Sequence, residues 1–438
     1  MLNARSVSLL LFAAILASAQ GEKKLKQGEY DPYNEVVKDI NTNNFTKALA
    51  DLDTWNQKFA DSDFKDDRTA FYVQAYTAAN QPAKAVEAAA GLLGRDLSTV
   101  FPGPTGQATI VRFLYNVVFA ISHDPNPTPE ALGVGEKAAH QLMAFDQPIP
   151  GVSTADWEKA RVSMKEQANA ALLYIAMQPG VQAMAKQPPD CAAADIAFTR
   201  ALNVYPDKSV LSYELGRALN CESKTQPEKL SAAIYEFERA AVIDPTLGDA
   251  KADAKKVPAF ADSAYVKVHG SDEGLDQLKQ TVRQSALPPE GFKVKTATDI
   301  AEEKRAEFET TNPQLALWMK IKGALADTAG EQYFTDQLKD SQVPQLRGVL
   351  VAVNQACHPK ELTVAVPLPD TQQTLRPEIK LVLDKPLSGK PELNQEFHWE
   401  GVPTAFTKDP FLLTMSADPA KIEGLKAGAC PVTTSRKK

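Results

Sequence analysis

The spacing of apolar residues divides the chain into two parts. From residue 31 to residue 286, apolar residues recur every three or four positions, which is the period of an amphipathic helix, and Asn, Pro and Gly mark the breaks. One such apolar stripe consists of Leu230, Ala233, Ile234, Phe237, Ala240 and Ala241. The pattern predicts a mainly α array of helices packed in pairs over residues 31–286.

After Val343 the apolar period changes from that of a helix to that of a strand. Residues 349–353, 362–366 and 379–383 alternate apolar and other side chains, and residues 396–399 and 411–415 are two further candidate strands. Short strands separated by Pro- and Gly-rich loops predict a small all-β domain over residues 343–431, either an OB-like barrel or a sandwich. Residues 287–342 are predicted to be a linker and helical connector, with Trp318 packing against the neighbouring domain.

Two segments of the helical part share one spacing of small, aromatic and proline residues. In each, a Phe follows the first Ala by four positions, a second Ala by seven and a Pro by twelve. Small residues let neighbouring helices approach, the aromatic ring fills the gap one turn along, and proline does not continue a helix. The pattern therefore predicts stacked helix pairs. Its residues are Ala194, Phe198, Ala201 and Pro206, and then Ala233, Phe237, Ala240 and Pro245.

Residues 190–246 resemble tetratricopeptide repeats, in which antiparallel helix pairs stack into a superhelix. Leu215 and Gly216 complete the motif in the second copy, whereas Ser212 stands where the family often has a large aromatic residue. The copies lie 39 residues apart (233 − 194) rather than about 34. Residues 43–49 and 80–86 resemble fainter copies. The resemblance implies a groove that binds a peptide or a partner helix.

The N-terminus has the pattern of a secretory signal peptide. Arg5 precedes an apolar run over residues 7–16, and Ala17-Ser18-Ala19 offers a cleavage site before Gln20. The run is too short to cross a bilayer of roughly 30 Å, and a buried N-terminal helix is the alternative. We expect residues 1–19 to be removed, residues 20–30 to fray, residues 432–438 to form a disordered basic tail, and the mature chain to be periplasmic or secreted, without a transmembrane segment.

An even number of cysteines in an exported chain predicts disulfides, so the four cysteines are expected to form two bonds. Cys191 and Cys221 each lie fifteen residues from Pro206, so a helix hairpin turning at Pro206 would bring them together at its open end. This predicts a Cys191–Cys221 bond and, by elimination, a Cys357–Cys430 bond. Free buried thiols are the alternative, and the spacing does not suit a zinc site.

Composition and motifs argue against nucleic-acid binding and against catalysis. The formal net charge is −7, whereas phosphate binding needs a basic surface. The sequence has no nucleophile elbow, phosphate-binding glycine loop or zinc-protease motif, and its five histidines do not form a metal-ligand pair. We therefore expect a protein that is not an enzyme and that has no catalytic residues, metal or cofactor.

Four residues are candidate ligand contacts. His398 and Trp399 lie on a predicted strand of the β domain, where an aromatic side chain can stack on a sugar or base, although such a Trp is more often part of the core. Tyr213 and Arg217 lie on a predicted inner helix of the array, where repeat packing alone would also explain the tyrosine.

Together these patterns favour a non-enzymatic scaffold or adaptor of the bacterial cell envelope that binds a protein or peptide through its helical groove. A carbohydrate- or polymer-binding protein that acts through the β domain is the alternative, and an enzyme with a site between the domains is a third reading. The sequence leaves open the identity of the partner and the oligomeric state.

Overall fold

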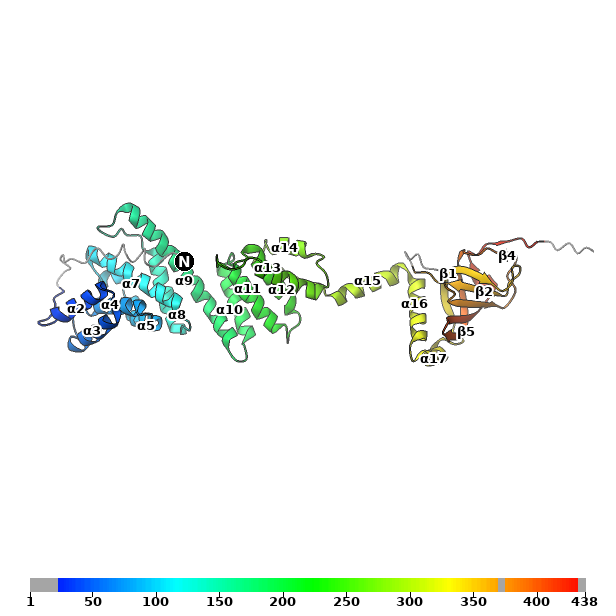
Figure 1. The fold of residues 1–438 in the computed structure, drawn as a ribbon, viewed down its shortest axis with the longest axis horizontal. Coiled ribbons are helices and arrows are strands. Elements are labelled where there is room, and N and C mark those ends of the chain that lie inside the picture. The colour runs from blue at the N-terminus through cyan, green and yellow to red at the C-terminus, as the bar shows by residue number, and fades with distance from the viewer. Residues whose placement is uncertain (1–22, 369–374, 432–438) are drawn as a thin grey trace, which may run out of the picture. The chain divides into compact units, whose positions relative to one another are not determined.

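The computed structural model describes residues 23–368 and 375–431, so the predicted signal peptide and basic tail lie outside the described residues. The chain forms two compact units, Met1–Val294 (unit 1) and Lys295–Lys438 (unit 2). Unit 1 is helical, and unit 2 combines helices with a β-barrel (Figure 1). The boundary after Val294 places most of the predicted connector, residues 287–342, in the same unit as the barrel.

Unit 1 is a solenoid-like series of helices that pack mainly against their neighbours in the chain (Figure 1). It begins with α2 (Tyr30–Asn41), α3 (Phe45–Lys58), α4 (Lys65–Ala78), α5 (Pro82–Leu93) and the short α6 (Leu97–Val100). It continues with α7 (Gly103–His123), α8 (Pro129–Ala144) and the long α9 (Thr154–Ala185). It ends with α10 (Cys191–Val204), α11 (Ser209–Glu222), α12 (Lys229–Ile243), α13 (Lys256–His269) and α14 (Leu275–Thr281). The prediction of an array of packed helices over residues 31–286 is confirmed.

Polar caps fix where several of these helices begin. The side chains of Thr128, Ser153 and Asp190 accept backbone N–H groups at the starts of α8, α9 and α10, which supplies partners for donors that a helix leaves free. The apolar faces form several local cores that follow one another along the chain. Such an arrangement suits a stack in which each helix pair is covered by the next.

The segment before α2 is ordered rather than frayed. Lys23 Nζ lies 2.7 Å from Asp67 Oδ2. Trp55 Nε1 donates a 2.7 Å hydrogen bond to Glu29, which is fully buried. The expectation of a frayed N-terminus over residues 20–30 is therefore wrong for residues 23–29, because buried polar contacts to α3 and α4 hold them in place.

The two segments with the shared spacing become α10 and α12, and their motif residues point into the packing. Their alanines and phenylalanines are all buried, as is Leu215 on α11. Each Phe packs on a glycine of the preceding helix: Phe198 lies on Gly180 of α9, and Phe237 lies on Gly216 of α11. Pro206 and Pro245 each follow the end of their helix by two residues.

Unit 2 begins with helices and closes into a barrel. Its helices are α15 (Ala297–Thr311), α16 (Pro313–Ala326), α17 (Gly330–Tyr333) and the π-helix η1 (Phe334–Leu338). The barrel strands are β1 (Val343–Val353), β2 (Glu361–Ala365), β3 (Ile379–Leu383), β5 (Glu396–Lys408) and β6 (Phe411–Ala417). The strand order is β1-β2-β3-β6-β5 with closure between β1 and β5, and β3 runs parallel to β6. Closure selects the barrel over the sandwich.

Short elements complete unit 2 around the barrel. Strand β7 (Ile422–Glu423) pairs with β5, and β4 (Lys390–Pro391) pairs with β8 (Ala427–Gly428). The 3-10 helix η2 (Pro419–Lys421) precedes β7. Ile422 of β7 packs against the barrel core.

Helix α16 packs on the barrel through Trp318, as the sequence predicts. Trp318 is buried with the barrel core, and its Nε1 donates a 2.9 Å hydrogen bond to Glu378 Oε2. Gly348 lets β1 pass close to the rest of the barrel, because a β-carbon there would lie 2.7 Å from the carbonyl oxygen of Ala365. The close approach allows β1 to pair with both β2 and β5.

Both predicted disulfides are present in the structure. Cys191 is bonded to Cys221 with a Cα–Cα distance of 5.8 Å, and Cys357 is bonded to Cys430 with a distance of 5.9 Å. Both distances lie in the usual range for disulfides. Two disulfides indicate an oxidising compartment outside the cytoplasm. Among the described residues, no helix has the length and apolar character needed to cross a membrane.

Candidate functional site

A cluster of aromatic rings reaches the surface of unit 1 where α11, α12 and α13 meet. The ring of Phe237 on α12 is buried, and it lies 4.9 Å from Phe260 of α13 and 5.8 Å from Tyr213 of α11 between ring centroids. Phe260 is 47% exposed, and Tyr213 is half-buried. We call Tyr213 and Phe260 the aromatic surface. A buried Phe thus supports two rings that remain accessible from outside.

A charged pair borders the aromatic surface on α11. Arg217 lies one turn after Tyr213, is exposed, and places its Nη1 2.7 Å from Glu214 Oε2. Aromatic residues beside paired polar groups are the usual composition of a protein-binding patch, in which the rings supply most of the affinity. The structure therefore brings the two candidate contacts Tyr213 and Arg217 to one face of one helix.

Arg239 holds the helices beneath this surface together. Its Nη1 donates a 2.7 Å hydrogen bond to Ser212 Oγ on α11, its Nη2 a 2.5 Å bond to the Pro206 carbonyl, and its Nε a 3.0 Å bond to the Ser285 carbonyl. The small side chain of Ser212 leaves room for this guanidinium. One buried side chain therefore links α12 to the turn before α11 and to the segment after α14.

Two buried glutamates, Glu236 and Glu238, lie on either side of Phe237 in the sequence, and sequence reasoning missed them. Glu236 and Glu238 are fully buried, and none of their carboxylate oxygens has a hydrogen-bond partner among the described residues. Burial raises the pKa of each to about 8. Ser212 and Arg239 lower the pKa of Glu236 in part. One feature of the sequence could have indicated their burial. Predicted helices precede and follow α12, which favours burial around its whole circumference.

The candidate contacts in the β-barrel do not form a common surface. Trp399 is fully buried in the barrel core, with 0% of its surface accessible to solvent. The centroid of its ring lies 5.2 Å from that of Phe397. The expectation of a ligand contact at Trp399 is therefore wrong, because strand alternation turns it inward. His398 is half-buried and points to the other face, where it lies across from Arg347 on β1.

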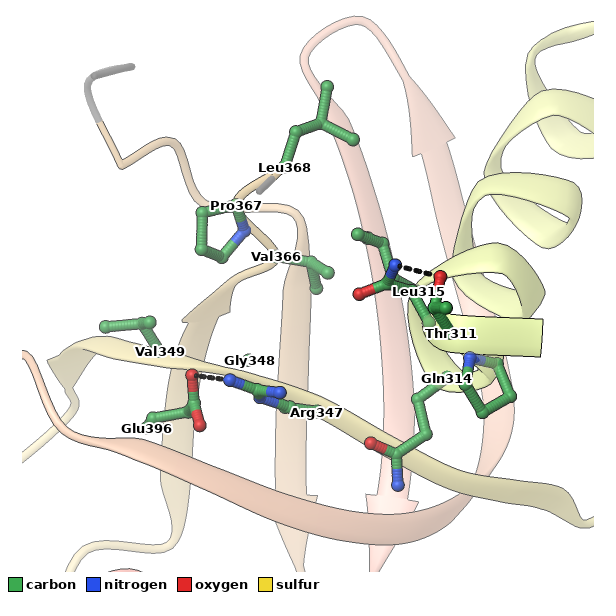
Figure 2. A pocket seen from close by; sticks show the side chains of 12 residues that line it. Thr311, Gln314, Leu315, Arg347, Gly348, Val349, Val366, Pro367, Leu368 and Glu396 are labelled. Carbon is green, nitrogen blue, oxygen red and sulfur yellow. Dashed lines mark hydrogen bonds and ion pairs between the residues drawn. The ribbon is translucent and has the colours of Figure 1, made fainter. Parts of the chain in front are cut away.

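Unit 2 has a pocket of about 330 Å³ between the start of α16, β1 and the segment after β2 (Figure 2). Leu315, Val349 and Val366 supply apolar walls. Arg347 and Glu396 line it as an ion pair, with Nη2 and Oε2 2.6 Å apart. Since the two charges of this pair already satisfy each other, the pocket does not single out a charged ligand.

A larger pocket of about 620 Å³ lies between α6, α7 and the end of α8 in unit 1. Phe101, Ile110 and Leu114 form its floor. Arg95 lies on its rim and donates two 2.8 Å hydrogen bonds to Asp66. Here too the cation on the rim is already paired.

Three carboxylates on α2 and α3 form ion pairs with the side chain of Lys47. Glu35, Asp39 and Asp51 are the group that could hold a metal ion among the described residues. Lys47 Nζ lies 3.3, 2.7 and 2.8 Å from their oxygens, respectively. The ammonium group therefore neutralises the position that a metal ion would take.

The comparisons add no relative to this description: no protein-family model matches the sequence, and searches of curated proteins and of solved structures give no match. The structure therefore combines an accessible aromatic surface with helices that are held together beneath it by the hydrogen bonds of Arg239. Tyr213 and Phe260 offer partly accessible aromatic area that rests on the buried ring of Phe237.

Proposed function

We propose that the protein is a non-enzymatic scaffold or adaptor that binds a protein partner through unit 1. The observation that carries this proposal is the exposure of Phe260 above the buried ring of Phe237. A large aromatic side chain that is half accessible at the meeting point of three helices is typical of an interface anchor. The partner's contact would centre on Tyr213 and Phe260, with Arg217 at its rim.

The packing of unit 1 supports a tetratricopeptide-like array as the frame of this surface. The contacts Gly180–Phe198 and Gly216–Phe237 are equivalent, and each joins a helix to the next one along the chain. Arrays of this kind present extended surfaces for peptides and helices. Two disulfides support a location in an oxidising compartment, which fits the cell envelope predicted from the N-terminal sequence.

Crosslinking and affinity capture in native envelope extracts test the proposal. The full mature chain is used as bait and compared with Phe260→Ser, which removes the exposed ring, and with Ile196→Ser, a matched control. Ile196 is 63% exposed on α10, so its loss should not affect folding or the aromatic surface. We expect Phe260→Ser to lower the recovery of the partner about tenfold, since an interface anchor contributes on the order of 1–2 kcal/mol.

The contrary result separates this proposal from the alternative. If Phe260→Ser captures the same protein as the unchanged chain, whereas Arg347→Ser in unit 2 loses it, binding takes place at the barrel. Capture of a carbohydrate polymer by all four chains, with no protein recovered, would support the polymer-binding alternative in place of the scaffold.

A further inference from the structure

Three ionisable groups from three neighbouring helices of unit 1 lie close together. Glu238 comes from α12, Asp262 from α13 and Lys279 from α14, and Lys279 Nζ lies 2.6 Å from Asp262 Oδ1. Glu238 lies next to Asp262, which raises its pKa, and next to Lys279, which lowers it. The cluster therefore contains two carboxyl groups and one ammonium group.

Glu238 has no other group to satisfy it. It is fully buried, and neither of its oxygens has a hydrogen-bond partner among the described residues. Tyr265 of α13 also faces it as a neutral phenol, and Asp276 adds a negative charge near Lys279. An ionised Glu238 would thus be a buried second carboxylate beside a partly exposed ion pair whose single cation already pairs with Asp262. Such a charge is strongly unfavourable.

We propose that the protonation state of Glu238 controls whether α13 stays packed on α12, and so whether the aromatic surface is formed. When Glu238 is neutral, it places no second negative charge beside the Asp262 carboxylate, and the Asp262–Lys279 pair is kept. When Glu238 loses its proton, two carboxylates face each other across the α12–α13 contact, and α13 separates. The link to partner binding rests on the function proposed above, whereas the opening itself does not.

Helix α13 is the element that such a repulsion would move. It buries only Ala261 and Tyr265, whereas α12 buries nine consecutive residues, Ala233–Ala241. Elements with few buried residues open at lower free energy than the rest of a structure. Asp262 lies two residues after Phe260 on the same helix, so an opening that relieves Asp262 also removes Phe260 from Phe237.

The direction of the pH dependence follows from linkage. Burial, and secondly Asp262, raise the pKa of Glu238 from 4.5 to about 8 in the packed state. In the opened state Glu238 reaches water and regains its ordinary pKa. The opened state therefore binds fewer protons between these two values, so opening becomes more favourable as the pH rises to about 8 and then levels off.

Amide hydrogen exchange of the full chain, corrected for the intrinsic rate at each pH, measures this opening without any partner. We expect protection over residues 256–269 to fall about tenfold for each pH unit between pH 6 and pH 8, and to change little above that. In Glu238→Gln, which keeps the shape without the charge, protection should stay constant. Glu236→Gln is the matched control: it neutralises the other buried carboxyl of α12 and should keep the dependence of the unchanged chain.

A second variant keeps the test decisive if Glu238→Gln does not fold. Asp262→Asn removes the opposing carboxylate and leaves Lys279 free to pair with an ionised Glu238, so the loss of protection should shrink. The proposal is overturned if protection over residues 256–269 does not change with pH, or if it falls equally in Glu238→Gln. Either result would leave the capture experiment with Phe260→Ser unaffected, so failures of the two proposals are distinguishable.

Discussion

Gly216 lies directly against the ring of Phe237: a β-carbon at Gly216 would be 2.8 Å from Phe237 Cδ1. The same relationship recurs one repeat earlier, where a β-carbon at Gly180 would be 2.6 Å from Phe198 Cε1. The phenylalanines of the shared sequence pattern thus need a glycine on the preceding helix. This contact lets α11 and α12 approach closely, and it positions Phe237 beneath the aromatic surface.

The first prediction concerns this close approach. Gly216→Ala should lower the free energy of unfolding by about 1–3 kcal/mol, because the added methyl group displaces a packed ring. Gly91→Ala is the matched control, since Gly91 also lies in a helix and has no atom within 4 Å of the added β-carbon. It should raise stability by up to ~1 kcal/mol through helix propensity. Denaturant unfolding of both variants checks the opposite signs, and equal effects would contradict the packing explanation.

The second prediction concerns Arg239. Arg239→Lys should destabilise unit 1 by about 2–4 kcal/mol, because an ammonium group does not reproduce the fork that binds the Ser212 hydroxyl and the Pro206 and Ser285 carbonyls. Arg217→Lys, on the exposed face of α11, should change stability by less than about 0.5 kcal/mol. Thermal unfolding compares the two. An Arg239→Lys chain as stable as the control would show that the three acceptors find other partners.

The third prediction concerns pH and Glu236. Burial raises the pKa of Glu236 from 4.5 to about 8 in the folded chain. The folded state therefore holds a proton that the unfolded state has lost between these values, and stability falls as the pH rises from about 5 to about 8. Urea midpoints at four pH values across this range should fall less steeply in Glu236→Gln. An unchanged slope would mean that Glu236 is ionised when folded.

The fourth prediction concerns the disulfides. Replacing Cys191 and Cys221 by Ser should lower stability by roughly 3–4 kcal/mol, and replacing Cys357 and Cys430 by roughly 4–5 kcal/mol, because the second bond spans 73 residues rather than 30. Hydrogen exchange should locate the first loss in unit 1 and the second in unit 2. Losses spread over both units by either replacement would contradict two independently stabilised units.

The sequence predicted most of the fold and part of the candidate site. Helical and strand periods located the array and the barrel, and the position of Pro206 midway between Cys191 and Cys221 predicted their pairing. Trp399 shows the limit: its residue type is more often found in a core but also fits a ligand contact, and only the structure shows that its side chain points inward. Tyr213 was identified as a candidate, but its partner Phe260 was not, because exposure of a single apolar residue leaves no periodic signal.

The sequence by itself determined which segments are helices or strands, since these depend on local apolar period, caps and prolines. Only the tertiary structure decided which side chains share an environment. In the sequence, Glu238 looks like an ordinary charged residue of a helix. Its raised pKa comes from burial and from Asp262, which α13 places beside it together with Lys279 of α14. Burial and electrostatics depend on residues far apart in the chain, which is why the packing of α12 against its neighbours, and not its own sequence, makes Glu238 proton-sensitive.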